Sequence, residues 1–279
     1  MTEKPAVLIT GCSTGIGRAT AERLTASGDW TVYATARDPE TLRDLAAAGA
    51  RVRRLDTCDE ESMRAVVDEA GDALFGLVNN AGYGEYGVVE ELPVESLRRG
   101  FETNVVGTVR LCQLALPRMR AAGAGRIVIV GSTGGLFTFP AAAGYHLTKY
   151  ALESLADALR YEVGPFGVGV TLIQPGLVRT EFGATALRTL AANGAAGGPY
   201  SEVKSQVDAM YRRAFSDPAA GVGPEAVAES IERALTGERA PSRELVAAEG
   251  PYFVDLRRDL GDEGFDGAVR TMLANPPQG

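Results

Sequence analysis

A tyrosine and a lysine at helical spacing could exchange a proton with a bound molecule. Tyr145 and Lys149 begin an expected helix over 145–163, and residues four apart share one face of a helix. A tyrosine hydroxyl has a pKa near ~10, which is too high for a base at neutral pH. A neighbouring ammonium stabilises the phenolate and lowers that pKa. Ser132 follows an expected strand over 126–130, and ligands of doubly wound sheets bind where strands end.

His146 directly follows the tyrosine in the sequence. One helical step of about 100° turns it away from Tyr145, so we expect it to pack or to line a pocket rather than to catalyse.

A glycine-rich loop lies between an expected strand over 6–10 and an expected helix over 16–27. Glycines allow backbone N–H groups to approach a pyrophosphate, and the start of a helix favours negative charge. Such a string can be an ordinary turn, but its place between a strand and a helix favours a dinucleotide site. The residues expected to bind the cofactor here are Gly11, Ser13, Thr14, Gly15, Ile16 and Gly17.

The end of the second expected strand bears on the choice between NADP and NAD. Arg37 comes first after this strand, where a guanidinium could hold a ribose 2′-phosphate. Asp38 lies about 20 residues beyond the glycine loop and could instead accept from the 2′-hydroxyl of NAD. Because Asp38 precedes Pro39, it is also a good helix N-cap. The sequence therefore favours NADP over NAD.

Apolar runs alternate with helical stretches along most of the chain, which predicts a doubly wound parallel α/β sheet of the Rossmann type. Strands are expected at 6–10, 30–35, 51–55, 74–79, 126–130, 167–173 and 244–248. Helices are expected at 16–27, 40–48, 60–70, 94–121, 145–163, 224–236, 252–260 and 265–273.

We expect a single domain over residues 1–279, because no linker or internal repeat interrupts the pattern. The Ala- and Gly-rich stretch at about 181–223 is interpreted as helical segments and loop that form a substrate lid. Residues from about 249 to 279 form a C-terminal extension.

With these motifs in this order, the chain resembles the short-chain dehydrogenase/reductase family over about residues 6–180. Further matching segments are Asp56 after the third strand, the run Asn79, Asn80, Ala81 and Gly82, Asn104 in the long helix, and the run Pro175, Gly176, Val178 and Thr180. Several strings, including the one that ends in Arg37 and Asp38, are closest to the hydroxysteroid and retinol dehydrogenase-like subgroup.

The resemblance implies a role for each residue. Tyr145 would donate or remove the proton of the carbonyl or alcohol, and Ser132 would orient the oxygen. Lys149 would bind the ribose and lower the pKa of Tyr145, while Asn104 would link Lys149 to solvent through a water molecule. Asp56 would contact the adenine. The remaining matched segments would lie along the cofactor, at Asn80, Ala81, Gly82, Pro175, Gly176, Val178 and Thr180.

The expected function is NADP(H)-dependent interconversion of a ketone or aldehyde with an alcohol. Apolar candidate pocket walls suggest a hydrophobic substrate; they are Gly134, Leu136, Phe137, Phe139, Leu177, Phe182 and Leu187. Two alternatives stay open. One is an epimerase or dehydratase that uses transient oxidation, and the other is a catalytically silent regulator that senses NADP.

Composition limits the kinds of molecule that the chain is expected to bind. A formal charge of -8 disfavours nucleic acid, and no apolar run could span a membrane. Three widely spaced cysteines indicate free thiols in the cytoplasm, and a single histidine argues against a zinc site. A homodimer or homotetramer is expected from helices 94–121 and 145–163, which carry apolar residues on several faces, including Leu111, Leu114, Leu152, Leu155 and Leu159.

Overall fold

A computed structural model describes residues 4–193, 197–217, 220–239, 241–248 and 250–274. Seven parallel strands form one sheet in the order β3-β2-β1-β4-β5-β6-β7. Their bounds are β1 Ala6–Ile9, β2 Thr31–Ala36, β3 Arg51–Arg54, β4 Leu74–Asn79, β5 Gly125–Val130, β6 Val168–Pro175 and β7 Arg243–Val246. The expected single Rossmann-type domain with a doubly wound parallel sheet is confirmed.

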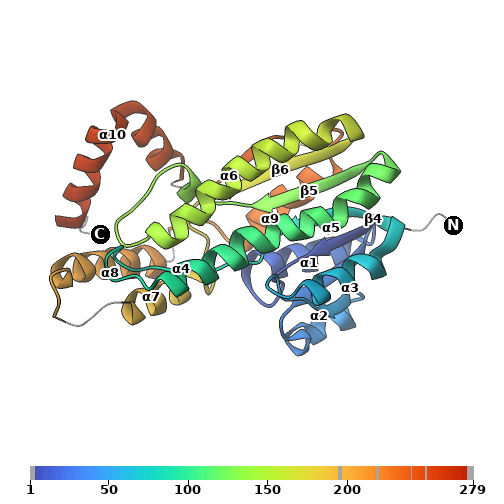
Figure 1. The fold of residues 1–279 in the computed structure, drawn as a ribbon, viewed down its shortest axis with the longest axis horizontal. Coiled ribbons are helices and arrows are strands. Elements are labelled where there is room, and N and C mark those ends of the chain that lie inside the picture. Colours follow the sequence, from blue (N-terminus) through green and yellow to red (C-terminus); the bar gives the residue numbers. More distant parts are fainter. Residues whose placement is uncertain (1–3, 194–196, 218–219, 240, 249, 275–279) are drawn as a thin grey trace.

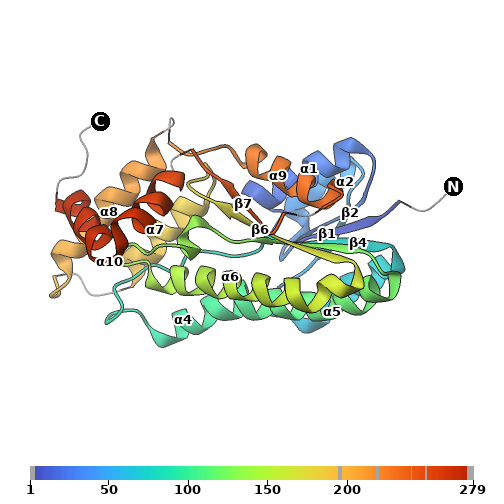
Figure 2. The ribbon, with the colours of Figure 1, turned by 90° about the horizontal axis from the view of Figure 1, so that it is seen from above.

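Helices cover both faces of the sheet, with α1, α2 and α9 on one side and α4, α5 and α6 on the other (Figure 2). The helices are α1 Gly15–Ser27, α2 Arg43–Ala47, α3 Glu60–Ala70, α4 Val94–Phe101, α5 Gly107–Ala122, α6 Ala143–Val163, α7 Phe182–Ala192, α8 Ser201–Ser216, α9 Pro224–Thr236 and α10 Gly250–Ala274. Short 3-10 turns lie at Pro39–Leu42, Gly71–Ala73, Thr133–Gly135 and Gly164–Phe166. Over the described residues, none of these helices is long and apolar enough to cross a lipid bilayer.

The first strand shows why the strands are apolar throughout. Ala6 and Leu8 belong to the core between the sheet and α3, α5 and α6, whereas Val7 and Ile9 belong to the core beneath α1 and α9. Successive side chains of a strand point to opposite faces, so a strand covered on both faces needs apolar residues at every position.

The expected helix over 94–121 is divided in the structure. α4 and α5 are joined by a π-helical turn over Glu102–Val106 that contains Asn104. A π turn widens a helix locally and is frequent at functional sites. Directly after it, a Cβ added at Gly107 would lie 2.4 Å from the Thr57 carbonyl oxygen, so the helix packs closely on the segment that follows β3.

The late helices gather at the end of the molecule opposite the N-terminus, where α7, α8 and α10 lie together (Figure 1). α10 is two helices that meet at a non-helical Gly261 with φ 64°, which agrees with the two helices expected over 252–260 and 265–273. All strands are parallel, so the segments that follow β1, β2, β4, β5 and β6 emerge at one edge of the sheet. The strand order reverses between β1 and β4, the position at which doubly wound sheets bind ligands.

The segment after β1 is held in place because its backbone lies very close to neighbouring atoms. A Cβ at Gly17 would lie 2.4 Å from both the Gly11 carbonyl oxygen and Asn80 Nδ2. Gly11 and Gly15 have φ of 72° and 60°, in the left-handed region that glycine adopts most easily.

Replacing Gly17 by Ala should therefore lower the free energy of unfolding by about 1–3 kcal/mol, because the backbone of the loop cannot move away cheaply. Urea unfolding measures the change. The matched control is Gly267→Ala on α10, where an added Cβ meets nothing within 4 Å, and which should raise stability by up to about 1 kcal/mol. Equal effects in the two variants would contradict this account of Gly17.

Candidate active site

The four candidate catalytic side chains lie at the carboxyl edge of the sheet and are almost fully covered. The exposed fraction is 2% for Asn104, 9% for Ser132, 8% for Tyr145 and 7% for Lys149. The ring of Tyr145 is 5.2 Å from that of Phe182 on α7 and 5.9 Å from that of Tyr86, centroid to centroid. These four side chains are therefore largely covered by other parts of the protein.

Burial shifts the pKa values of Tyr145 and Lys149. Burial raises the pKa of Tyr145 to about 12, and a hydrogen bond with Ser132 lowers it in part. Burial also lowers the pKa of Lys149 to about 8. Lys149 Nζ lies 5.6 Å from the centre of the Tyr145 ring and donates to the Val130 carbonyl at 2.9 Å. In the ligand-free protein the net shift of the Tyr145 pKa is upward, because burial disfavours the charged phenolate.

Ser132 begins a tight turn after β5. Its hydroxyl accepts from the Gly134 N–H at 3.0 Å and donates to the Pro175 carbonyl at 3.4 Å. This pairing holds the hydroxyl at the end of β6 and beside Tyr145.

His146 supports the loop that follows this turn. Its Nδ1 lies 2.7 Å from the Gly134 carbonyl, and its Nε2 accepts from the Phe139 N–H at 3.3 Å. Nδ1 is therefore the protonated nitrogen, and burial lowers the pKa of the ring. The structure agrees with the packing role expected for this residue.

Asn104 holds the loop after β4 against α6. Its Nδ2 donates to the Tyr83 carbonyl at 3.0 Å and to Thr148 Oγ1 at 3.1 Å, and its Oδ1 accepts from the Tyr83 N–H at 3.1 Å. A Cβ on Gly82 would meet Asn104 Oδ1 at 3.0 Å. Asn104 is thus a bridge between two elements of the site.

The segments after β1 and β4 are tied together by side chains. Asn80 Nδ2 donates to the carbonyls of Thr10 at 2.8 Å and Gly11 at 3.1 Å. Thr10 Oγ1 accepts from the N–H groups of Asn80 and Ala81, each at 3.0 Å. Thr10 is the first residue of the glycine-loop motif, but its bonds to Asn80 and Ala81 could not be predicted from the sequence.

The glycine segment has the features of an anion cradle. Thr14 precedes α1 without a side-chain cap bond, and no acidic residue occupies the first turn, so the first N–H groups of α1 are not paired with its own side chains. Ser13 and Thr14 are exposed. Thr180 lies across from this loop, since a Cβ on Gly15 would meet Thr180 Cγ2 at 3.0 Å. These residues fit a dinucleotide phosphate, and the half-buried Ile16 packs beneath them.

Arg37 and Asp38 have different surroundings after β2. Asp38 caps the following turn, because its Oδ1 accepts from the Glu40 N–H at 3.0 Å. Arg37 is exposed at the carboxyl edge. Asp56, two residues beyond β3, is half-buried and accepts from the Cys58 N–H at 2.9 Å.

The segment after β6 crosses the same edge. The Gly176 N–H donates to the Val246 carbonyl at 3.0 Å, and Val178 forms a parallel bridge with Val222. Thr180 Oγ1 accepts from the Phe182 N–H at 3.3 Å, which places the start of α7 beside the glycine segment.

The expected pocket walls fall into separate groups. Phe139, Phe182 and Leu187 pack around Tyr145, and Gly134 lies against His146. Phe137 packs instead with Phe253 and Phe265 of α10, at ring distances of 5.7 and 6.0 Å. Leu136 and Leu177 are half-buried and belong to neither aromatic group.

The loop after β4 is bonded to α7 and α8 by residues that sequence reasoning missed. Thr189 Oγ1 donates to the Gly84 carbonyl at 3.1 Å. Asn193 Nδ2 donates to buried Glu85 Oε1 and to the Tyr86 carbonyl, each at 2.7 Å. An ion pair of 2.7 Å joins Lys204 of α8 to Glu91. Isolated polar residues in a segment of weak periodicity gave no sequence signal for these contacts.

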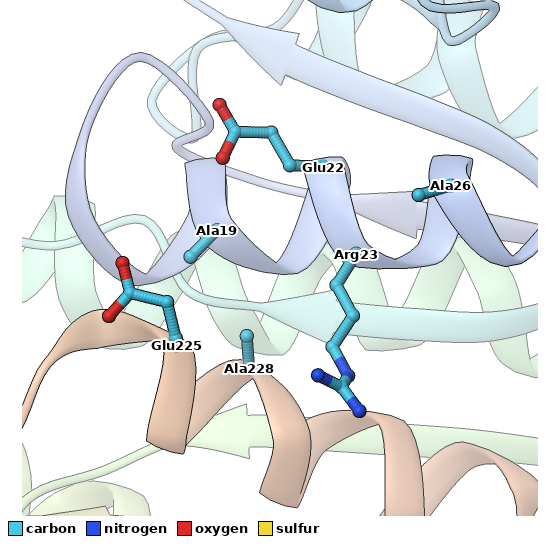
Figure 3. A pocket seen from close by; sticks show the side chains of 6 residues that line it. All are labelled: Ala19, Glu22, Arg23, Ala26, Glu225 and Ala228. Atoms are coloured by element: carbon cyan, nitrogen blue, oxygen red, sulfur yellow. The ribbon is translucent and has the colours of Figure 1, made fainter.

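A groove of about 320 Å³ lies apart from these residues, between α1 and α9 (Figure 3). Its lining residues are Ala19, Glu22, Arg23, Ala26, Glu225 and Ala228. Arg23 pairs with Glu232 at 2.5 Å. The groove therefore contains none of the candidate catalytic residues.

The leucines of α5 and α6 that were expected at a subunit interface lie in the core of the domain instead. Leu111, Leu152 and Leu159 are 0%, 3% and 6% exposed, and Leu114 and Leu155 pack against the same core. The three cysteines are free, with Cys12 and Cys112 buried and Cys58 exposed.

Comparison with known proteins gives consistent matches. A family model described as short chain dehydrogenase matches residues 5–190. An uncharacterized oxidoreductase of Bacillus subtilis, YusZ, is 33% identical over 269 residues, which cover 92% of this chain and 94% of the relative. The 17-beta-hydroxysteroid dehydrogenase type 1 of Homo sapiens is 36% identical over 275 residues, which cover 90% of this chain and 79% of the relative.

Solved structures match over nearly the whole chain. A short-chain dehydrogenase from Streptomyces avermitilis has a TM-score of 0.77 and 33% identity, with 98% of this chain and 96% of that chain covered. A short chain dehydrogenase/reductase from Burkholderia phymatum in complex with NAD has a TM-score of 0.77 and 27% identity, with 92% and 94% covered. A serine dehydrogenase complexed with NADP+ has a TM-score of 0.72 and 25% identity, with 87% and 94% covered.

Replacing Lys149 by Met should stabilise the ligand-free protein at neutral pH. The shift from 10.5 to about 8 means that charged Lys149 costs about 3 kcal/mol, and its hydrogen bond to Val130 offsets about 1 kcal/mol. We expect a net gain of about 2 kcal/mol. The folded-state pKa lies below the unfolded one, so the gain is complete below pH 8 and fades as pH rises to 10.5.

Urea unfolding between neutral pH and pH 10.5 measures this gain. The control is Lys4→Met, which removes an exposed amine that donates to the Gly28 carbonyl and should lower the stability by at most about 1 kcal/mol. A Lys149→Met protein that is less stable than the wild type at neutral pH would contradict the claim that burial makes this amine costly.

Proposed function

Because this chain belongs to the short-chain dehydrogenase/reductase family, close to its hydroxysteroid dehydrogenase-like members, we propose that it is an NADP(H)-dependent oxidoreductase that interconverts a ketone or aldehyde with an alcohol. The supporting observation is the covered group of Ser132, Tyr145 and Lys149 beside the edge where the glycine segment emerges. A nicotinamide dinucleotide bound at that edge supplies or accepts the hydride.

Each candidate catalytic residue has a distinct task. Tyr145 donates its hydroxyl proton to the carbonyl oxygen during reduction and takes it back during oxidation. Ser132 hydrogen-bonds the same oxygen and orients it. Lys149 binds the ribose hydroxyls, and Asn104 keeps the loop after β4 in place against α6 through Tyr83 and Thr148.

Arg37 supports the preference for NADP over NAD. It is exposed at the end of β2, where a 2′-phosphate would lie, while the Asp38 carboxylate is already engaged as a cap. The phosphates would be held by the α1 N-terminus with Ser13 and Thr14. Asp56 would contact the adenine.

The surroundings of Tyr145 support an apolar substrate. Phe139, Phe182 and Leu187 pack around it, and the two helices over 181–223 cover it in the manner of a lid. We also propose a cytoplasmic homodimer or homotetramer. Support for the assembly comes from Leu147 and Tyr150 of α6, which are 51% and 43% exposed.

Replacing Tyr145 by Phe should lower kcat for ketone reduction by roughly 10²- to 10⁴-fold, because the proton donor is lost while the ring remains. Nicotinamide absorbance measures turnover with a panel of apolar ketones. The matched control is Tyr161→Phe, which removes a phenol that is 81% exposed on α6 and should not change kcat. Unchanged turnover in Tyr145→Phe would contradict the role given to Tyr145, whereas binding of NADP(H) by a wild type that turns over no ketone or alcohol would favour the regulator alternative.

Replacing Arg37 by Asp should lower kcat/KM for NADPH by about 10- to 100-fold relative to NADH, because a charged hydrogen bond to phosphate is lost. The companion variant Asp38→Asn keeps a good cap and removes the carboxylate. If Asp38 instead bound the ribose of NAD, Asp38→Asn would selectively impair NADH. Equal use of both cofactors by the wild type would contradict the role given to Arg37.

A further inference from the structure

Three residues at helical spacing follow one another along α6. Tyr145 and Lys149 are the first two, and Glu153 is the third. Residues four apart lie one turn apart on the same face of a helix, so Glu153 comes one turn after the candidate catalytic pair. Its side chain is only 13% exposed. A largely buried carboxylate therefore lies next to the site without a part in the proposed chemistry.

Both oxygens of this carboxylate have partners on the sheet. Oε1 accepts from Gln174 Nε2 of β6 at 2.7 Å, and Oε2 accepts from Arg243 Nε of β7 at 2.8 Å. Arg243 also donates to Asp157 Oδ1 of α6 at 2.8 Å. A buried carboxylate needs such partners, because an unpaired one would be costly. Glu153 thus joins α6 to the last two strands of the sheet.

The turn that carries Ser132 lies against the same carboxylate. A Cβ added at Gly135 would lie 3.0 Å from Glu153 Cγ, 3.1 Å from Glu153 Oε1 and 3.0 Å from the Lys149 carbonyl oxygen. The Gly135 N–H donates to the Ser132 carbonyl at 3.0 Å, so Gly135 closes the turn that begins at Ser132. The absence of a side chain at Gly135 lets this turn approach Glu153 closely.

A second connection leads from Glu153 to the hydroxyl of Ser132. Gln174, which donates to Glu153, directly precedes Pro175 at the end of β6. The Pro175 carbonyl accepts from the Ser132 hydroxyl at 3.4 Å. The turn and the acceptor of its hydroxyl are therefore both connected to α6 through one carboxylate.

This step rests on the proposed reaction at Tyr145. We propose that Glu153 is a positioning residue that sets the place of the Ser132 hydroxyl relative to the Tyr145 hydroxyl. The two hydroxyls belong to different elements, the turn after β5 and the helix α6, yet both must contact the same substrate oxygen. A misplacement of about 1 Å can cost a factor of about 10² in rate. Glu153 acts through the turn and does not contact the reacting atoms.

The last strand offers a matched control on its opposite face. Arg243 and Glu244 are successive residues of β7, so their side chains point to opposite faces of the sheet. Glu244 Oε1 accepts from Ser230 Oγ of α9 at 2.7 Å and forms an ion pair with Arg233 of α9. Glu244→Gln therefore breaks an ion pair of the same strand on the face away from α6 and the turn that carries Ser132.

The first experiment measures kcat for ketone reduction in Glu153→Gln and Ser132→Ala, alone and combined. In Glu153→Gln an amide donor faces Arg243 at unchanged side-chain size, so the contact is lost. We expect kcat to fall by about 10- to 100-fold, with KM for NADPH unchanged. In the Ser132→Ala background the same substitution should lower kcat by less than about twofold, because no hydroxyl remains to be positioned. Glu244→Gln should not change kcat in either background.

The comparison between the two backgrounds tests the role of Glu153. If Glu153 only supported the fold, its loss would displace Tyr145 and Lys149 as well, and kcat would fall by the same factor with or without Ser132. That result would overturn the proposal, as would an unchanged kcat in Glu153→Gln. Arg243→Met breaks the same ion pair from β7 and keeps the carboxylate, so it should lower kcat in the same background-dependent way.

Hydrogen exchange of the ligand-free protein measures the turn itself and needs no turnover. The amides that donate within the turn are those of Gly134, Gly135 and Leu136. If Glu153 holds this turn, these amides should exchange at least about threefold faster in Glu153→Gln, because local opening becomes easier. In Glu244→Gln they should exchange at the wild-type rate.

The exchange rates separate this proposal from the proposed function. If no ketone is turned over but exchange in the turn is faster in Glu153→Gln alone, the oxidoreductase proposal fails and the control of the Ser132 position by Glu153 stands. If ketones are turned over and exchange in the turn is the same in the wild type and both variants, the role of Glu153 fails and the oxidoreductase proposal stands.

Discussion

The site depends on the exclusion of water from a phenol and an amine that lie side by side. Burial raises the pKa of Tyr145 and lowers that of Lys149 to about 8, so at neutral pH the phenol is neutral while the amine keeps its charge at a cost in free energy. Such a pair is a poor source of folding stability, since a buried ammonium costs free energy unless a partner compensates it. A site that tolerates this cost is expected where function needs it.

The loop after β4 explains how the surroundings stay dry. On one side, Asn104 fixes Tyr83 and contacts Thr148 of α6. On the other side, Thr189 and Asn193 bind the same loop to α7 and the residue that follows it. The helix α7 that covers Tyr145 is therefore held by the loop after β4 as well as by its own chain connection to β6.

Local signals predicted much of the fold. The bounds of α3, β4 and α9 agree with the expectation, because Asp59 caps α3 through the N–H groups of Glu61 and Ser62 and Pro224 starts α9. Asp38 was recognised as a cap for the same reason. The π turn at Asn104 could not be predicted, since the partners of its side chain are 21 and 44 residues away.

Residues of the candidate site could be predicted where a sequence motif identifies them. They could not be predicted where their position depends on packing between distant parts of the chain. Types and spacing sufficed to nominate Tyr145 and Lys149, but periodicity could not assign the apolar residues of buried helices to core or surface. Leu111 and Leu152 were therefore interpreted as interface residues and are core residues. Tyr86 and Tyr211 are 125 residues apart in the chain, and only the folded protein brings them together.

The C-terminal extension is connected to the surroundings of Tyr145 through two apolar residues, Phe139 of the loop before α6 and Leu273 of α10. Both residues pack in the group of side chains around Tyr145 and in the group that α10 forms with Phe137. The Phe139 N–H donates to His146 Nε2, and His146 Nδ1 lies 2.7 Å from the Gly134 carbonyl. The loop between Ser132 and α6 is therefore held in place by packing against α10 and by hydrogen bonds to His146. Since a displaced hydroxyl at Ser132 would lose its orienting role, the placement of α10 contributes to the geometry of the site.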